Sequence, residues 1–284
     1  LSTATTGLTT LGAAATGLST LDISGPARIG TATVTTSGAQ TYGGAVTLGA
    51  TTTLTAASVD VTGAVNALAS GVQGLTVNAS GNTRFRSTVG ATTALAALTT
   101  NAAGSTTLTG DVTTTGAQTY NDAVTLAAST EASGSALNFN AAVDGAFGLT
   151  VTSAGTSTFG GAVDIASLAS AGTGGVALDG GSVTTTGAQT YAGIVTLGGD
   201  TTLTGTALSF NNATTPLAAA SHDITLRTRA LTFGAGAITG ETGATATLAG
   251  YTDADTVSLA SATVSTANFT QAELSKLGQF DTVT

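Results

Sequence analysis

The stretch TTSGAQTYGGAVTL (residues 35–48) decides the fold class of this chain of 284 residues, because it occurs three times. The second copy is TTTGAQTYNDAVTL (113–126) and the third is TTTGAQTYAGIVTL (184–197). The tyrosines that the copies share are 78 and 71 residues apart. A chain that repeats itself at such a period is typically a stack of similar units, in which each unit covers the apolar face of the next.

Other segments repeat at a similar distance. GLTVNASGNTRF (74–85) returns as GLTVTSAGTSTF (148–159), and SHDITLRTRALTF (221–233) is a third, looser version. We therefore expect residues 1–284 to form one solenoid of about 3.5 imperfect repeats, each of roughly 75 residues. The repeat pattern is already under way at the first residue and still under way at the last. This predicts that the chain is a fragment of a longer protein.

Within each repeat, apolar residues recur at every second position, which indicates strands with one buried face. The triplet V-T-L shows this alternation at 46–48, 124–126 and 195–197. The sequence predicts that Val46, Val124 and Val195 share one inward column. The same alignment places Ala132 inward and Glu131 outward.

The composition separates two all-β architectures. Hydrophobic residues make up 42% of the chain and the mean hydropathy is +0.37, which excludes a disordered chain of high charge. A sandwich or barrel needs antiparallel hairpins and larger core residues, whereas small Ala, Val and Leu side chains suit the thin core of a solenoid. We predict a right-handed parallel β-helix of about 14 rungs, each about 20 residues long.

One segment near the C-terminus has a helical pattern. Thr270 can cap a helix, and Glu273 stands where it would close a capping box. The sequence predicts a short helix over 271–277, followed by a return to strand.

Charge and cysteine content exclude several partners and chemistries. The net charge is −9 with only six Lys and Arg, which argues against nucleic acid and anionic membranes as partners. No apolar run is long enough for a membrane helix, so no membrane insertion is expected. The chain has no cysteine, which excludes disulfides and thiolate ligands. We predict no cofactor and no metal.

The sequence offers few candidates for catalysis. His222 is the only histidine, no G-x-S-x-G motif occurs, and we interpret His222 as a turn residue. Asp253 and Asp255 form a D-x-D pair, but calcium needs more oxygen ligands than this pair supplies. A polysaccharide-cleaving β-helix enzyme stays an alternative, although the acids are scattered and Trp is absent. We predict no enzymatic activity.

Two arginine pairs are the predicted ligand-binding residues. Arg84 and Arg86 flank Phe85, and Arg227 and Arg229 flank Thr228, so each pair should point outward from one strand and could bind an anionic glycan. The alternative is that these arginines pair with acidic residues. T-x-T arrays on a flat face can also bind ice, but the irregular rung lengths argue against a flat lattice here.

Several phrases resemble the repeats of a known class of very large surface proteins. TTTGAQTYNDAVTL, GDTTLTGT (199–206) and GLTVTSAGTSTFGGAV (148–163) resemble repeats of the filamentous-haemagglutinin-like adhesins and exoproteins of Gram-negative bacteria. The segment from residue 254 to the end resembles a unit of the same proteins in which strands enclose a short T-x-A-E-L helix.

The resemblance implies a right-handed parallel β-helix that is exported by an outer-membrane β-barrel secretion partner. It implies an extracellular fibre on the bacterial cell surface that contacts surface receptors, glycans or abiotic surfaces in attachment, aggregation or biofilm. We therefore expect a structural shaft segment. A self-assembling homopolymeric filament is the alternative within the same class.

Overall fold

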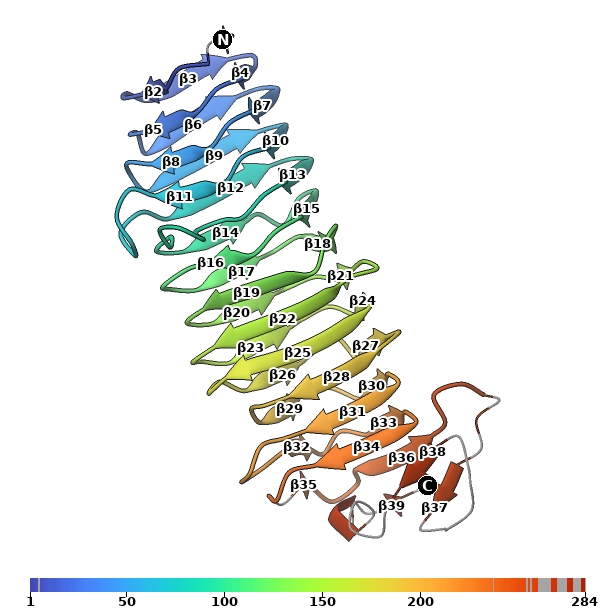
Figure 1. The fold of residues 1–284 in the computed structure, drawn as a ribbon. Coiled ribbons are helices and arrows are strands. Elements are labelled where there is room, and N and C mark those ends of the chain that lie inside the picture. Colours follow the sequence, from blue (N-terminus) through green and yellow to red (C-terminus); the bar gives the residue numbers. More distant parts are fainter. Residues whose placement is uncertain are drawn as a thin grey trace. The chain divides into compact units, whose positions relative to one another are not determined.

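The structure is a computed structural model that describes residues 1–4, 6–236, 238–253, 255, 257–259, 267–269, 275–277 and 282–283. It contains two compact units, unit 1 (Leu1–Ala146) and unit 2 (Phe147–Thr284). Each unit is a parallel β-helix with three sides, here called sheets A, B and C (Figure 1). The chain visits the sides in the order A, B, C and then starts the next turn.

In unit 1 every turn places one short strand on each side, with one irregularity. Sheet A contains β1 (Ser2–Thr3), β4 (Leu21–Ile23), β7 (Ala39–Tyr42), β10 (Ser58–Val61), β13 (Asn82–Phe85), β15 (Ser105–Leu108), β18 (Ala123–Leu126) and β21 (Val143–Asp144). Sheet B contains β2 (Thr9–Leu11), β5 (Ala27–Ile29), β8 (Val46–Leu48), β11 (Val65–Ala67), β16 (Val112–Thr113) and β19 (Thr130–Gly134). Sheet C contains β3 (Ala15–Leu18), β6 (Thr33–Thr36), β9 (Thr52–Ala56), β12 (Leu75–Ala79), β14 (Leu98–Thr100), β17 (Gln118–Tyr120) and β20 (Leu137–Phe139). Between β11 and β16 the side is continued only by single bridges through Val89.

Unit 2 repeats the arrangement. Sheet A contains β24 (Val163–Ile165), β27 (Ser182–Thr185), β30 (Thr201–Thr204), β33 (Ile224–Arg227), β36 (Thr245–Ala249) and β39 (Thr282–Val283). Sheet B contains β22 (Gly148–Ser153), β25 (Ser167–Gly172), β28 (Ala188–Tyr191), β31 (Ala207–Phe210), β34 (Ala230–Phe233), β37 (Val257–Leu259) and β38 (Ala267–Phe269). Sheet C contains β23 (Ser157–Phe159), β26 (Val176–Leu178), β29 (Val195–Leu197), β32 (Leu217–Ala220) and β35 (Thr239–Gly240).

The parallel pairing confirms the predicted fold class. Neighbouring strands of a side belong to consecutive turns, as in β7 and β10 of unit 1 or β28 and β31 of unit 2, and both pairs are parallel. An antiparallel sandwich is therefore excluded. Counted through both units, the chain makes about 12 turns, close to the predicted 14.

The predicted parity of the strands is also confirmed. Val46, Val124 and Val195 are all buried, with exposed fractions of 3%, 0% and 0%. Ala132 is buried and Glu131 is exposed, as the alignment requires. Alternation of side chains along a strand is a local property, which explains why the sequence predicts it well.

The predicted single inward column is wrong, because equivalent residues of the three copies lie on different sides. The V-T-L triplets form β8 on sheet B, β18 on sheet A and β29 on sheet C. Within unit 1, β7 of the first copy is on sheet A and β17 of the second is on sheet C. The chain passes about eleven sides between them, and eleven is not a multiple of three.

A buried glutamine explains why the phrase G-A-Q-T-Y is repeated. In the second copy, the Nε2 amide of Gln118 donates hydrogen bonds to the carbonyl oxygens of Val112 and Ser133, at 3.0 and 2.9 Å. Its Oε1 accepts a hydrogen bond from the Tyr120 hydroxyl at 2.9 Å. Buried polar groups need such partners, so one side chain satisfies backbone groups of two successive turns.

The other copies build the same network. Gln40 and Gln189 each donate to two backbone carbonyls at 2.9–3.1 Å, and each accepts the hydroxyl of the tyrosine two residues later at 3.0 and 2.8 Å. The phrase is therefore a structural cassette that fits any of the three sides.

The tyrosines of the cassette lie in the core. Tyr120 is fully buried and stacks on Phe139 of the next turn, with ring centroids 5.0 Å apart. In unit 2, Tyr191, Phe210 and Phe233 form a continuous stack with spacings of 5.3 and 5.1 Å. These spacings match the distance between strands of adjacent turns, so each ring covers the next.

The described part of the C-terminal segment agrees with the predicted change of pattern. Residues 275–277 form a helical turn, and β39 pairs in parallel with β36. The rest of the predicted helix, 271–274, lies outside the described residues.

Candidate functional site

The two predicted arginine pairs occupy similar places in their units, where sheet A ends and the chain turns toward sheet B. In unit 1, Arg84 lies within β13 and Arg86 follows it directly. In unit 2, Arg227 ends β33 and Arg229 lies just before β34. Both pairs point away from the core, because Phe85 and Thr228 between them are buried.

In unit 1 the arginine pair is built around Asp60 of the preceding turn. Arg86 binds this carboxylate through two hydrogen bonds of 2.7 Å, from Nε to Oδ1 and from Nη2 to Oδ2. Arg84 is the register partner of Asp60 on the neighbouring strand and makes no ion pair with the described residues. The hydrogen bond from Arg86 lowers the pKa of Asp60 below its usual range.

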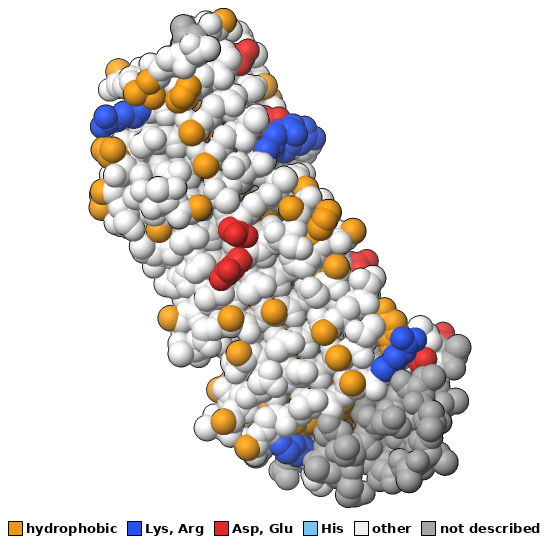
Figure 2. Space-filling model, in the orientation of Figure 1, with side chains coloured by type: hydrophobic (Ala, Val, Ile, Leu, Met, Phe, Trp, Pro, Cys, Tyr) orange, Lys and Arg blue, Asp and Glu red, His pale blue; other side chains and the backbone are white. Residues whose placement is uncertain are grey.

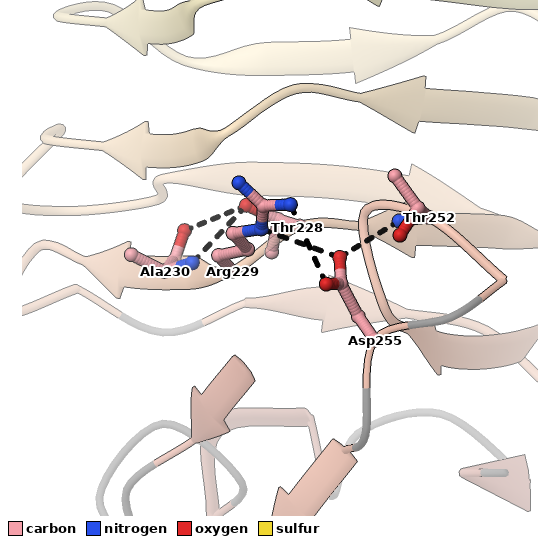
Figure 3. Close-up of polar contacts among 5 residues, drawn as sticks. All are labelled: Thr228, Arg229, Ala230, Thr252 and Asp255. Atoms are coloured by element: carbon pink, nitrogen blue, oxygen red, sulfur yellow. Dashed lines mark hydrogen bonds and ion pairs between the residues drawn. The ribbon is translucent and has the colours of Figure 1, made fainter. Parts of the chain in front are cut away.

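In unit 2 the arginines pair with the D-x-D acids. Arg227 forms an ion pair with Asp253. The Nε of Arg229 lies 3.3 Å from Oδ2 of Asp255 (Figure 3). The guanidinium carbon of Arg229 lies 5.2 Å from the ring centroid of Tyr251. The two carboxylates therefore bind two cationic side chains.

A backbone contact adds to this arrangement. The N–H of Thr252 donates to Oδ2 of Asp255 at 2.8 Å, and together with Arg229 it lowers the pKa of this carboxyl (Figure 3). Three of the four arginines thus have an internal carboxylate partner. Any anionic ligand would compete with an ion pair at these three and would meet no such competition at Arg84. Glycan binding by the four stays a prediction.

His222 lies two residues before β33, where the sequence predicts a turn residue. Its Nδ1 is 3.9 Å from a carboxylate oxygen of Asp200, whose side chain is 76% exposed. The Asp200 carboxylate also accepts the N–H of Asp223 at 2.9 Å. A contact between a half-buried imidazole and a largely exposed carboxylate does not resemble the buried and oriented pair that activates a nucleophile.

One carboxylate was missed by the sequence reasoning. Asp122 is 3% exposed, and no other Asp or Glu residue that the structure describes is as buried as a whole, although the side chain of Asp255 is only 6% exposed. Its oxygens accept hydrogen bonds from the hydroxyls of Thr100 at 2.6 Å and Thr106 at 2.9 Å. These threonines lie on either side of the 101–104 loop of the preceding turn. The hydrogen bonds of Asp122 therefore hold both ends of that loop in place.

Comparison of the three copies does not reveal the role of Asp122, because the other two copies have no side chain at this position. The residue equivalent to Asp122 is Gly44 in the first copy and Gly193 in the third. A Cβ atom on Gly44 would lie 2.6 Å from the carbonyl carbon of Gly25, and on Gly193 it would lie 1.9 Å from the carbonyl oxygen of Gly174. Only the wider corner below Asp122 leaves space for a side chain.

Among the described residues, no other cluster of charged side chains suggests a catalytic or metal-binding site. No group of three or more His, Asp or Glu residues is placed to hold a metal ion in the part of the chain that the structure describes. A shallow cleft is lined by Gly17, Leu18, Ser19, Thr35, Thr36 and Ser37, none of which is ionisable. Figure 2 shows few charged side chains on the face that it presents. Across the described residues, no helix is long and apolar enough to span a membrane.

Comparison with protein-family models, with curated proteins and with solved structures found no match.

Proposed function

We propose that this chain is a structural shaft segment of a secreted bacterial surface adhesin or filament. The observation that carries the proposal is the stacking within each unit. Three parallel hydrogen-bonded sides surround a core of aliphatic columns and aromatic stacks. In such a stack each turn is supported by its neighbours, so force along the axis is shared by the hydrogen bonds of all three sides.

The chemistry of the surface supports a mechanical role. The predicted binding arginines are largely engaged by aspartates, and the histidine lacks the setting of a catalytic base. The repeated cassette satisfies backbone groups of the core. We propose that the chain has no enzymatic activity of its own. Incubation with pectins, alginates and glycosaminoglycans tests this, and release of unsaturated or reducing ends would overturn it.

The proposed location is the extracellular face of the bacterial cell surface, reached through an outer-membrane β-barrel partner. The resemblance of the repeats supports this, and a cysteine-free chain is compatible with passage through such a pore. The test uses antibodies against residues 1–284 on intact cells. Labelling of intact cells is expected. Labelling only after lysis would contradict the proposal.

Attachment is the functional readout. A strain that lacks the parent gene is compared with the wild type and with a complemented strain on glass, plastic and epithelial cells. Reduced attachment or aggregation that is restored by complementation is expected. Equal attachment of all three strains on every surface would argue strongly against an adhesin.

A further inference from the structure

The outward face of sheet C in unit 1 carries a ladder of threonines in register. Five consecutive strands, β6, β9, β12, β14 and β17, place a threonine opposite a threonine. The ladder consists of Thr33, Thr53, Thr76, Thr99 and Thr119. Its members are 20 to 23 residues apart, so the irregular rung lengths are absorbed by the corner loops. The irregularity that argued against an ordered lattice in the sequence therefore does not disturb this side.

The hydroxyls of this ladder are available to an external partner. Oγ1 of the first four threonines makes no hydrogen bond within the described chain, and Thr119 only accepts a long contact of 3.5 Å from Asn138. Inward threonines behave differently, since the hydroxyls of Thr36 and Thr114 each donate to a backbone carbonyl at 2.7 and 2.8 Å. The ladder thus presents evenly spaced hydroxyls and methyls, about 4.8 Å apart.

The residue composition of sheet C limits the kinds of partner that it can bind. Its described strands carry no charged residue in either unit, although the chain has a net charge of −9. Anionic glycans, phosphates and cationic proteins therefore find no complementary charge there. Its aromatic residues, Tyr120, Phe139 and Phe159, are all buried, so no ring is available to stack on a sugar.

The size of the face argues against a second copy of this chain as the partner. Six strands from β6 to β20, about three residues wide, cover roughly 300 Å² at ordinary strand spacings. A stable protein–protein interface buries about 800 Å² on each partner. The ladder is best matched by an uncharged, rigid and periodic surface. Such a surface would present hydrogen-bonding groups at about the spacing of the threonines, about 4.8 Å.

We propose that the threonine ladder of sheet C binds ice. Water molecules in a crystal face are uncharged donors and acceptors in a fixed lattice, and a threonine hydroxyl can replace one of them. The methyl groups between the hydroxyls favour ordered over liquid water at the surface. The partner pays no conformational entropy, because its lattice is already rigid. This inference does not depend on the proposed adhesin function.

The test uses the full chain and two matched tyrosine substitutions. Thr76→Tyr places a bulky ring in the middle of the ladder. Thr107→Tyr is the control, since Thr107 is an outward, half-buried threonine at an equivalent strand position on sheet A. Thermal hysteresis is measured by nanolitre osmometry, and a fluorescently labelled chain is tested for binding to a single ice crystal. Circular dichroism and thermal unfolding verify the fold of each variant.

The wild type and Thr107→Tyr are expected to show thermal hysteresis and to label ice, and Thr76→Tyr is expected to lose both. If Thr76→Tyr does not fold, Thr76→Val removes the hydroxyl while keeping the shape, and it is expected to reduce the hysteresis. Absence of hysteresis and of ice labelling in the wild type would overturn the proposal, as would equal activity in all folded variants. A dimer, or binding to insoluble cellulose, that Thr76→Tyr abolishes without any ice activity would assign the face to those partners instead.

Discussion

The cassette glutamine offers a sharp test of how the core is stabilised. The change Gln118→Leu keeps the volume of the side chain but removes its amide. It removes the hydrogen bonds to the carbonyl oxygens of Val112 and Ser133 and the one from the hydroxyl of Tyr120, although the Ser133 oxygen still accepts the backbone N–H of Thr114 at 2.9 Å. Each lost hydrogen bond costs about 1 kcal/mol, and a buried group left unpaired costs about 1–3 kcal/mol. Two groups that lose this partner and one further lost hydrogen bond predict a loss of about 3–7 kcal/mol, which burial of the apolar leucine reduces by about 2 kcal/mol.

Hydrogen exchange measured by mass spectrometry is the appropriate assay. Unfolding of a stacked protein need not be two-state, so a local readout is better than a single midpoint. Faster exchange is expected in the peptides that cover β16 to β20, with little change in β4 to β8. The control is Thr119→Val on the same strand, which is outward and half-buried. A loss below about 1 kcal/mol, or one no larger than in the control, would refute the energetic role of the glutamine.

Three further changes test other contacts. Arg86→Gln should raise the pKa of Asp60 toward its usual range, measured by NMR titration, because the main cause of its lowering is removed. Since the carboxylate is the paired form, the stability from this ion pair is lost as the pH falls through the lowered pKa. Phe210→Ala interrupts the aromatic stack of unit 2 and should cost about 3–5 kcal/mol in denaturant unfolding. Asp122→Ala should lower the free energy of unfolding by about 1–3 kcal/mol and make the 101–104 loop more sensitive to limited proteolysis. An unchanged cleavage pattern would contradict the idea that Asp122 holds the ends of this loop.

The sequence predicts which residues of each strand point inward. It does not predict which of the three sheets each strand joins, because that depends on the number of strands in each turn. Alternation placed Glu131 outside and Ala132 inside, because successive side chains on a strand point in opposite directions. The number of sides per turn is set by corner loops, and nothing in the phrase itself reveals it. The predicted column of Val46, Val124 and Val195 failed for this reason.

The candidate sites show a similar division. The sequence predicts that the arginines flank inward residues and could pair with acids, and three of them do. Their partners, 26 residues away, became visible only when consecutive turns were aligned. The role of the buried Asp122 was not predicted, because the equivalent residues of the other two copies are glycines. The sequence feature that could have indicated it is an aspartate at a position where the other copies have no space for a Cβ atom.

The shift of the cassette from side to side has a consequence for how such genes change in length. Recombination between two copies would insert or remove about eleven strands, which is three turns and two thirds. Every residue downstream would then change phase by a third of a turn and move to another face. Interior positions would tolerate this, because the cassette already fits sheets A, B and C. A face-specific surface such as the threonine ladder would survive only if it lay within one copy or if the exchange restored the phase. Length variants of the parent gene should therefore preserve the core pattern while scrambling the order of exposed residues on each face.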